Sequence, residues 1–432
     1  MKIALVHDYI KEYGGAERVL EALHEIWPDA PVYTSVYLPE YLGPHKKRFA
    51  GWDIRTSWFQ HMPYAAKLIS PFRLIAPFVF QEFDFSGFDV VIVSATGAYT
   101  PNMIKIRNPK SEILNKSQST KYQISNPLHV CYCHTPPRYL YGYATAREWK
   151  KHVIFRVMGE LANHFLRLMD FKSSQNVDYF IANSQNIAGR IQEFYRKDSI
   201  VIYPPVDISA SSSIASSVQL KNKKLNANHL DAKRYFIAGG RLARPKHIDL
   251  IVRACRELNL PLKVFGKGFA GYAEEIQEYS HPGKGALGDR IQDLVGDSGV
   301  VQLPRMTDSI EFVGEVSDEE KFTLMRGAKA YIFAAEDEDF GITPVEAMAC
   351  GIPVIAYRSG GVVESVLEGK TGIFFDDLSI ASLAKAIKQL NNITISSSDC
   401  IKQAEKFSKE RFKKEIKKFV IDKYSQDVDL IW

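Results

Sequence analysis

The chain has 432 residues, of which 46% are hydrophobic and 24% charged, close to the averages of globular proteins. This composition excludes a disordered, fibrous or disulfide-rich class, and the length predicts two large domains or three small ones. The 55 Lys and Arg residues against 50 Asp and Glu leave a net charge of only +5, which argues against a wholly basic, nucleic-acid-binding surface.

The cysteines and the N-terminus predict a reducing, cytoplasmic location. The five cysteines are odd in number and scattered, and Cys131 and Cys133 fit a buried strand better than a zinc site, because no further ligands accompany them. Charged residues from Asp8 onward leave no room for a signal-peptide core. No stretch approaches the roughly 20 apolar residues that span a bilayer, so we expect no membrane-spanning segment.

Short β-branched and aromatic runs alternate with helical patterns along the whole chain. Runs that are apolar on both faces predict parallel sheets covered on both sides, and two such sets predict two doubly wound α/β domains. We expect strands over residues 2–9, 31–37, 89–96, 129–135, 179–184 and 200–205, and then over 235–240, 262–268, 310–316, 330–335, 353–357 and 371–375. The Ser-, Asn- and Lys-rich segment 209–233 is typical of a connection, so we place the domain boundary after residue 207. Because ligands of such sheets bind beyond the carboxyl ends of the strands, a central cleft between the domains is the expected site.

The first expected strand is followed by Gly14 and Gly15 and then by a helix. Glycines at this place let a phosphate or a sugar approach the backbone closely. A plain tight turn explains the pair equally well, and the absence of a Gly-x-Gly-x-x-Gly pattern gives little support to an NAD site.

Segment 41–81 interleaves basic and aromatic residues, and Asp53 is its single acidic residue. This composition suits the surface of an anionic membrane leaflet, which would make the protein peripheral at the inner face of the membrane. Ordinary core and loop packing explains the segment equally well, so both interpretations stay open. A second polar stretch, from Arg107 to residue 127, is typical of an inserted loop.

The strand expected over 129–135 ends at His134, and two prolines delay the next helix. A histidine at the carboxyl end of a strand can donate to a sugar hydroxyl or stabilise charge near a reacting carbon. A structural role is the more common one for a lone histidine.

Arg241 and Lys246 lie between the strand at 235–240 and the next helix, at a spacing that lets them converge on one doubly charged group. A departing diphosphate needs such cations, because negative charge grows on its oxygens as the bond breaks. Two solvated basic residues are the alternative, although cations oppose the dipole at a helix N-terminus unless an anion is present.

The densest pattern is a strand, an acidic turn and a helix expected to start at Thr343 with Pro344 in its first turn. Glu338 and Glu346 flank this start, and carboxylates suit paired sugar hydroxyls. The N–H groups from Phe340 to residue 345 are expected to face an anion.

Each of these carboxylates also has a simpler interpretation. Glu346 can close a capping box with Thr343, and Glu338 can belong to a solvated acidic loop. The run from Asp337 to Asp339 is also a weak metal-binding pattern, but we expect no metal, because hard cations usually need more oxygen ligands. Near the C-terminus, Phe412, Ile416, Phe419 and Val420 form one stripe of an amphipathic helix that must dock on another element.

Together, the runs GGAERVL, HTPPRYLYG, GGRLARPK, FVGEVSDEEKF, EDEDFGITPVEAMACGIPVIA and GGVVESVLEGKTGIFF resemble the retaining glycosyltransferases of family 4 over nearly the whole chain. The opening of the chain most resembles the O-antigen mannosyltransferase-like branch. The resemblance implies the GT-B fold, in which two Rossmann-like domains face a central cleft. It implies an acceptor-side domain at 1–207, a donor-binding domain at 208–402 and a C-terminal helix within 403–432 that packs back on the first domain.

The resemblance also assigns roles to single residues. It places Arg241 and Lys246 at the donor diphosphate and Glu346 at the nucleotide ribose. It places His134 and Glu338 at the transferred sugar, and thus makes His134, Arg241, Lys246 and Glu338 the expected catalytic residues. The remaining donor contacts that it implies are Gly14, Gly15, Val313, Val316, Phe340, Gly341, Ile342 and Thr343. Lys267 is a departure, because many relatives carry an acidic residue there.

The implied activity is a metal-independent, retaining transfer of a hexose to a glycan or lipid-linked acceptor in cell-surface polysaccharide synthesis. GDP-mannose is the first choice of nucleotide-sugar donor. Three alternatives stay open: a sugar-nucleotide-binding protein without turnover, a GT-B-fold epimerase and a metal-dependent transferase.

Overall fold

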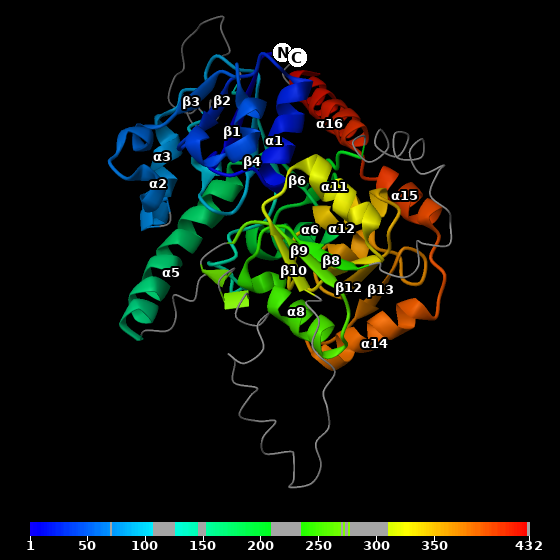
Figure 1. Cartoon of the computed structure of the whole chain (residues 1–432). Coiled ribbons are helices and arrows are strands. Elements are labelled where there is room, and N and C mark those ends of the chain that lie inside the picture. The colour runs from blue at the N-terminus through cyan, green and yellow to red at the C-terminus, as the bar shows by residue number, and fades with distance from the viewer. Residues whose placement is uncertain are drawn as a thin grey trace, which may run out of the picture. The chain divides into compact units, whose positions relative to one another are not determined.

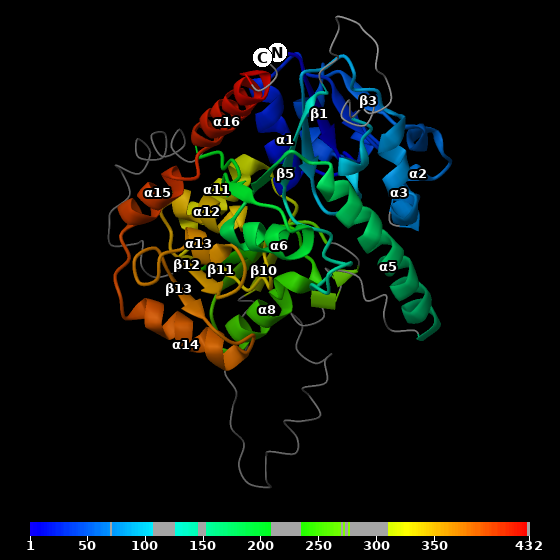
Figure 2. The same cartoon turned by 180° about the vertical axis from the view of Figure 1, so that it is seen from behind.

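The computed structural model describes residues 1–69, 71–106, 126–145, 153–208, 235–268, 271–272, 275–276 and 310–429 (Figures 1 and 2). The polar stretch expected from Arg107 lies almost wholly outside the described residues, and the connection at 209–233 does so completely. The chain divides into two units, and each is described by itself. Unit 1 comprises Met1–Tyr143, Trp149–Pro205 and Phe407–Trp432, and unit 2 comprises Ala144–Glu148 and Val206–Lys406. The sequence predicts a domain boundary after residue 207 and a C-terminal segment that packs back on the first domain from residue 403. Both positions lie within a few residues of the points where the chain passes from one unit to the other.

Unit 1 contains a seven-stranded parallel sheet in the order β3-β2-β1-β4-β5-β6-β7. Its strands are β1 (Ile3–His7), β2 (Val32–Thr34), β3 (Ile54–Thr56), β4 (Val90–Ala95), β5 (Leu128–Cys133), β6 (Tyr179–Ala182) and β7 (Ser199–Val201). The expected strands all appear. β3 was not predicted, because it is a three-residue edge strand with an exposed Arg55 at its centre.

The helices of unit 1 cover both faces of this sheet, because its strands are apolar on both sides. They are α1 (Gly15–Ile26), α2 (Ala65–Leu68), α3 (Ala76–Val79), α5 (Val153–Gln175), α6 (Gln185–Tyr195) and α16 (Lys409–Asp429). Cys131 and Cys133 face the layer that contains α6, whereas Val130 and Tyr132 face the layer that contains α1 and α16. The side-chain period of two in a strand produces this alternation. The 3₁₀ helices are η1 (Pro39–Tyr41), η2 (Gly43–Phe49), η3 (Trp58–His61), η4 (Pro71–Leu74), η5 (Phe80–Glu82) and η6 (Pro101–Met103).

The C-terminal helix α16 lies beside α1, as both views of the fold show (Figures 1 and 2). Phe412, Ile416 and Val420 are fully buried, and Phe419 packs at the edge of the same cluster. The apolar stripe seen in the sequence therefore docks on unit 1.

Unit 2 contains a six-stranded parallel sheet in the order β10-β9-β8-β11-β12-β13. Its strands are β8 (Phe236–Gly239), β9 (Leu262–Phe265), β10 (Ile310–Gly314), β11 (Ala330–Phe333), β12 (Val354–Tyr357) and β13 (Gly372–Phe375). Its helices are η10 (Arg244–Lys246), α8 (Ile248–Glu257), α11 (Asp318–Gly327), α12 (Ile342–Ala349), α13 (Val362–Ser365), α14 (Ile380–Asn391) and α15 (Ser397–Glu405). Both units thus have the doubly wound α/β architecture that the alternation of patterns predicts.

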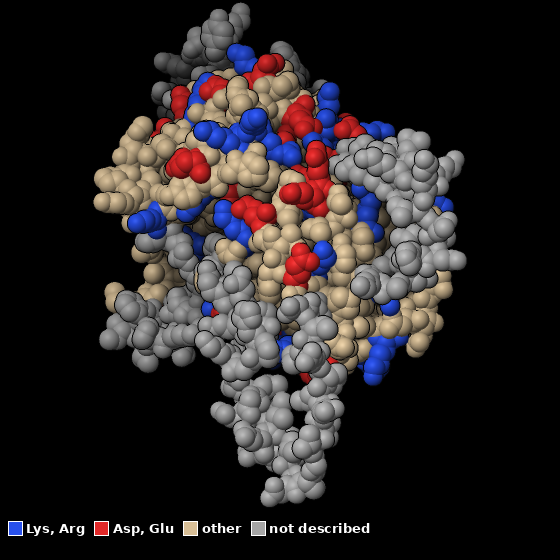
Figure 3. Space-filling model, viewed as in Figure 1, with Lys and Arg blue, Asp and Glu red and all other residues tan. Residues whose placement is uncertain are grey.

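The surface carries mixed charge. In the view of Figure 3, acidic and basic side chains of the described residues are interspersed and do not form one basic field. Of the helices in the described ranges, none combines the length and the apolar composition that crossing a bilayer requires.

Candidate functional site

The predicted donor residues of unit 2 lie at the carboxyl edge of its sheet, where the strand order reverses. β8 and β11 are neighbours, with β9 and β10 on one side and β12 and β13 on the other. The connections after β8 and β11 therefore leave in opposite directions, and such switch points are where open α/β sheets bind ligands. Arg241 and Lys246 follow β8, and Glu338 follows β11.

An ion pair joins these two connections. The Lys246 Nζ lies 2.5 Å from the Glu338 Oε2, and these side chains are 24% and 22% exposed. The backbone N–H of Glu336 donates to the carbonyl of Pro245 at 2.8 Å, so backbone as well as side chains connect the two segments. Arg241, whose side chain is exposed, lies on the same loop as Lys246. The structure therefore brings a predicted diphosphate ligand next to a predicted sugar ligand.

Gly360 and Gly361, which follow β12, shape the turn that carries Glu338. The backbone N–H of Gly361 donates to the Glu338 carbonyl at 2.7 Å. A Cβ at Gly360 would lie 2.2 Å from that same carbonyl oxygen, and one at Gly361 would lie 2.4 Å from the Asp339 oxygen. Only glycines permit this approach. The sequence offered no reason to assign a donor contact to Gly360 or Gly361, although two adjacent glycines after a strand are a recognisable pattern.

The helix expected at Thr343 begins one residue earlier. Its N-cap is Gly341, whose φ of 88° lies in the left-handed region, and no side chain caps the helix. Glycine takes this conformation without steric cost, so it can turn the chain into the helix before Thr343 is reached. The capping-box alternative for Glu346 is therefore wrong. The first-turn N–H groups after Gly341 are left for other acceptors.

Glu346 instead forms a buried ion pair. It is 1% exposed, and its Oε1 accepts a hydrogen bond from the Nζ of Lys321 at 2.7 Å. Lys321, on α11, also lies 2.9 Å from Asp318. Sequence reasoning missed Lys321, because a lysine in a run of charged helical residues looks like an ordinary solvated one. This ion pair holds the Glu346 carboxylate in place at the first turns of α12.

The residues expected at the base lie farther along the sheet edge. Val313 is in β10 and Val316 follows it, and both are partly buried. β10 is the edge strand next to β9, so the sheet separates these two valines from the ion pair of Lys246 and Glu338 by the width of β9.

The predicted residues of unit 1 also surround a switch point, here between β1 and β4. Gly14 is the N-cap of α1, and its N–H donates to the Glu17 Oε2 at 2.8 Å. Gly15 starts the helix. His134 follows β5, and its backbone is fixed on both sides: its N–H donates to Ala95, and its carbonyl accepts from Asn183.

The His134 ring is buried, with 8% of the residue exposed. Its Nε2 lies 2.9 Å from the Ser94 Oγ. Burial lowers the pKa of His134 to about 3, so the imidazole is neutral near pH 7. The sequence suggested two roles for His134, a hydrogen bond to a sugar hydroxyl and stabilisation of charge near the reacting carbon. A neutral ring can perform the first of these.

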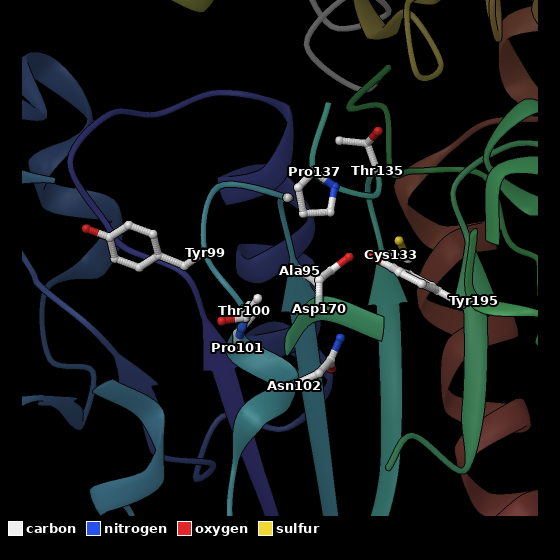
Figure 4. Close-up of a pocket in the computed structure, with 11 residues that line it drawn as sticks. Ala95, Tyr99, Thr100, Pro101, Asn102, Cys133, Thr135, Pro137, Asp170 and Tyr195 are labelled. Carbon is white, nitrogen blue, oxygen red and sulfur yellow. The ribbon is translucent and has the colours of Figure 1, made fainter. Parts of the chain in front are cut away.

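Two buried acids near this edge were not predicted as functional. Asp8 follows β1 and accepts a hydrogen bond from the N–H of Thr96 at 2.8 Å, and burial raises the pKa of its carboxyl. Burial also raises the pKa of Asp170, on α5, to about 7, although Tyr141 donates to its Oδ2 at 2.9 Å. Figure 4 shows Asp170 and Tyr195 among the residues that line a small pocket beside the ends of β4 and β5. No sequence signal separates a buried aspartate on a helix from an exposed one.

Comparison with known proteins identifies the second unit. Residues 221–407 match the family model described as Glycosyl transferases group 1. Unit 2 is a group 1 glycosyltransferase domain. The expected family resemblance is therefore confirmed for the part of the chain that contains Arg241, Lys246, Glu338 and Glu346.

Relatives extend the similarity beyond this glycosyltransferase domain. The chain is 25% identical to the alpha-1,3/1,6-mannosyltransferase ALG2 of Mus musculus over 440 residues, which cover 94% of this chain and 93% of that protein. It is also 25% identical to ALG2 of Dictyostelium discoideum over 281 residues, or 63% of this chain, and there the alignment spans 64% of the relative.

Solved structures match nearly the whole length of the chain. Anabaena Alr3699/HepE in complex with UDP has a TM-score of 0.62 at 17% identity, and the match covers 98% of this chain and 100% of that one. Sucrose-phosphate synthase from Thermosynechococcus elongatus has a TM-score of 0.63 at 16% identity, with coverage of 99% and 100%. At this identity the matches show the fold, and the expected GT-B class with two Rossmann-like domains is confirmed. The roles of single residues and the absence of a metal stay predictions, although in the described part of the chain no three His, Cys, Asp or Glu side chains gather as metal ligands.

Proposed function

We propose that the chain is a retaining hexosyltransferase that uses a nucleotide-sugar donor and acts in cell-surface polysaccharide synthesis. The observation that carries this proposal is the ion pair of Lys246 and Glu338 at the switch point of a glycosyltransferase domain. It places a cation suited to a diphosphate beside a carboxylate suited to sugar hydroxyls. The acceptor is a hydroxyl of a glycan or of a lipid-linked saccharide.

The proposed donor contacts divide by chemistry. Arg241 and Lys246 bind the diphosphate, and Gly14 and Gly15 let it approach the backbone. Glu346, which Lys321 orients, accepts from the ribose hydroxyls. Glu338 and His134 bind the transferred hexose. The backbone of Phe340, Gly341, Ile342 and Thr343 and the segment that holds Val313 and Val316 supply the remaining contacts.

In the proposed reaction, the bond between the anomeric carbon and the diphosphate oxygen breaks as the acceptor hydroxyl attacks from the same face. The hydroxyl proton passes to the departing phosphate oxygen, so no enzymic base is needed. Fixed cations stabilise the charge that develops on the leaving group, which lowers the barrier. Because Arg241 and Lys246 supply this charge, we propose that transfer needs no metal and continues in EDTA.

Two nucleotide sugars are candidates for the donor. The similarity to ALG2 mannosyltransferases supports GDP-mannose. The similarity to a structure solved with UDP-glucose makes a UDP-hexose the second candidate.

The test incubates purified protein with GDP-mannose or UDP-glucose and a lipid-linked acceptor, and follows release of nucleoside diphosphate. R241A, K246A and E346Q should each lower kcat/KM at least 100-fold, because each removes a donor contact. K263A is the matched control, since Lys263 forms a similar ion pair with Glu311, at 2.9 Å, in the same unit. Binding of a donor without release would indicate a sugar-nucleotide-binding protein, and isomerised free donor would indicate an epimerase. Near-normal turnover in all three variants would exclude the assigned sites.

We also propose that unit 1 contacts an anionic lipid surface. Segment 41–81 divides: Phe49, Phe59 and Phe80 are core residues, whereas other aromatic and aliphatic side chains are exposed. The exposed ones are Tyr41, Trp58, Tyr64, Leu74 and Phe78. The interpretation of this segment as ordinary core therefore holds for part of it only.

Helix α5 adds a second exposed apolar face to the same unit. Met158, Leu161, Phe165 and Leu168 recur at a spacing of three and four residues and are all exposed. α3 and α5 both contact η6, so these two helices are neighbours in unit 1 (Figure 2). Lys67, Arg73 and Lys172, on α2, η4 and α5, are basic and suit an anionic leaflet, whereas Glu160 on α5 is an acidic residue beside this face.

Sedimentation with vesicles tests this contact. Wild-type protein should bind vesicles that contain phosphatidylglycerol more strongly than vesicles of phosphatidylcholine alone. L161Q and L168Q should each weaken that binding several-fold, because each removes an apolar side chain from the lipid boundary. I421Q, at an exposed position on α16, is the control. Equal binding by all variants would contradict the proposal.

A further inference from the structure

A line of four buried polar side chains crosses the carboxyl edge of the sheet in unit 1. His7 ends β1, Ser94 lies near the end of β4, and His134 follows β5. His7 and Ser94 are direct partners in the parallel register of β1 and β4. Glu17, in the first turn of α1, completes the line. We call these four residues the relay: Glu17, His7, Ser94 and His134.

Hydrogen bonds join three members of the relay, and the carboxylate of the fourth faces the first ring without a hydrogen bond to it. The Glu17 Oε1 lies 3.7 Å from the His7 Nε2. The His7 Nδ1 lies 3.2 Å from the Ser94 Oγ, and the Ser94 Oγ lies 2.9 Å from the His134 Nε2. All four residues are buried, so water does not compete for these positions.

The carboxylate at one end sets the direction of the hydrogen bonds. A carboxylate accepts only, so it favours a proton on the nitrogen that faces it, the His7 Nε2. With that proton on Nε2, the His7 Nδ1 accepts from the Ser94 hydroxyl. Ser94 then uses its oxygen to accept from the His134 Nε2–H. This order leaves the His134 Nδ1 without a proton, as a hydrogen-bond acceptor.

We infer that Glu17, His7 and Ser94 are positioning residues that hold His134 in the tautomer whose Nδ1 accepts a hydrogen bond from a hydroxyl of the bound sugar. This inference rests on the proposed function and deepens it, because it says which kind of group His134 recognises. Glu17 also accepts from the N–H of Gly14, so the turn proposed to admit the diphosphate and the ring proposed to bind the sugar share one buried carboxylate.

Two variants separate the parts of the relay. S94A removes the partner of the His134 Nε2–H. E17Q keeps an acceptor for the Gly14 N–H, since glutamine also serves at this capping position, but it removes the charge that faces His7. S173A is the matched control: Ser173 is equally buried in unit 1 and donates to the carbonyl of Asp170 on its own helix.

The first measurement is independent of activity. In protein labelled with ¹⁵N-histidine, the ring signals of His134, assigned from the H134N spectrum, should show a proton fixed on Nε2 at pH 7. S94A and E17Q should shift these signals toward the other tautomer, and S173A should not. A proton on Nδ1 in the wild type, or an unchanged His134 spectrum in both relay variants, would overturn the inference.

The second measurement uses donors that each lack one sugar hydroxyl. S94A should lower kcat/KM about tenfold for the intact donor but leave one deoxy donor, the one that lacks the recognised hydroxyl, nearly unaffected. An equal loss with every donor would show a merely structural role. If the wild type transfers no sugar from any donor, the proposed function fails, while the NMR measurement still decides the state of His134.

Discussion

At the scale of single residues, burial decides which titratable groups depart from their ordinary behaviour. Asp170, His134 and His129 are all buried in unit 1, but burial acts on them in opposite directions. It raises the pKa of the acid to about 7 and lowers those of the histidines to about 3 and 4. In each case the neutral form is favoured, because an uncompensated charge in a dry interior is costly.

Asp170 makes unit 1 less stable as the pH rises. The folded carboxyl keeps its proton up to about pH 7, whereas the unfolded one loses it near 3.8. Between these values the unfolded chain binds fewer protons, so stability falls as pH increases and the loss is complete above pH 7. D170N removes this titration. The free energy of unfolding of D170N, measured relative to that of wild type, should increase by at most about 4 kcal/mol as the pH is raised from about 4.5 to about 7.5.

Urea unfolding followed by tryptophan fluorescence measures this effect, because all five tryptophans belong to unit 1. The buried histidines are present in both proteins and cancel in the difference. D198N, at an exposed position, serves as the control and should follow wild type at every pH. A difference between D170N and wild type that does not change with pH would contradict the assignment.

At the scale of elements, the turns after the strands carry the site, and glycines let them approach one another. Gly360 and Gly369 offer a direct comparison, since their φ angles are 70° and 71°. A Cβ at Gly369 meets nothing within 4 Å, whereas one at Gly360 would meet the backbone of Glu338. The first substitution adds backbone strain alone, and the second also displaces the turn that carries Glu338.

G360A should therefore raise the KM for the donor or lower kcat by at least tenfold, because Glu338 loses its position. G369A should cost roughly 1 kcal/mol of stability, the left-handed strain alone, and leave the kinetics near those of wild type. Steady-state kinetics and far-UV circular dichroism of both variants provide the comparison. Identical kinetics in G360A and G369A would show that the close approach has no part in donor binding.

At the scale of the whole molecule, the last helix of the chain belongs to the first unit, because α16 follows unit 2 in the sequence but is part of unit 1. Phe412 is fully buried, with its ring 5.7 Å from that of Tyr132 on β5. Stability of the first unit therefore depends on the last helix.

F412A should lower the free energy of unfolding of unit 1 by about 3–5 kcal/mol, the usual cost of deleting a buried phenylalanine. Tryptophan fluorescence in urea reports this transition, and I421A, an exposed position on the same helix, should change it little. The unfolding of unit 2, followed by circular dichroism, should keep its midpoint in F412A. An unchanged fluorescence midpoint would mean that α16 does not stabilise unit 1.

The sequence by itself determined the two sheets, all their strands except β3, and the amphipathic C-terminal helix, because hydrophobic periodicity is a local property of the chain. It also placed Arg241, Lys246 and Glu338 at strand ends, where a parallel sheet collects its functional groups. Only the tertiary structure joined Lys321 to Glu346, Gly360 to Glu338, and Ser94 to His134. These partners come from different elements, and their contacts depend on which strands are neighbours and which side chains are buried. A short window of sequence contains neither fact.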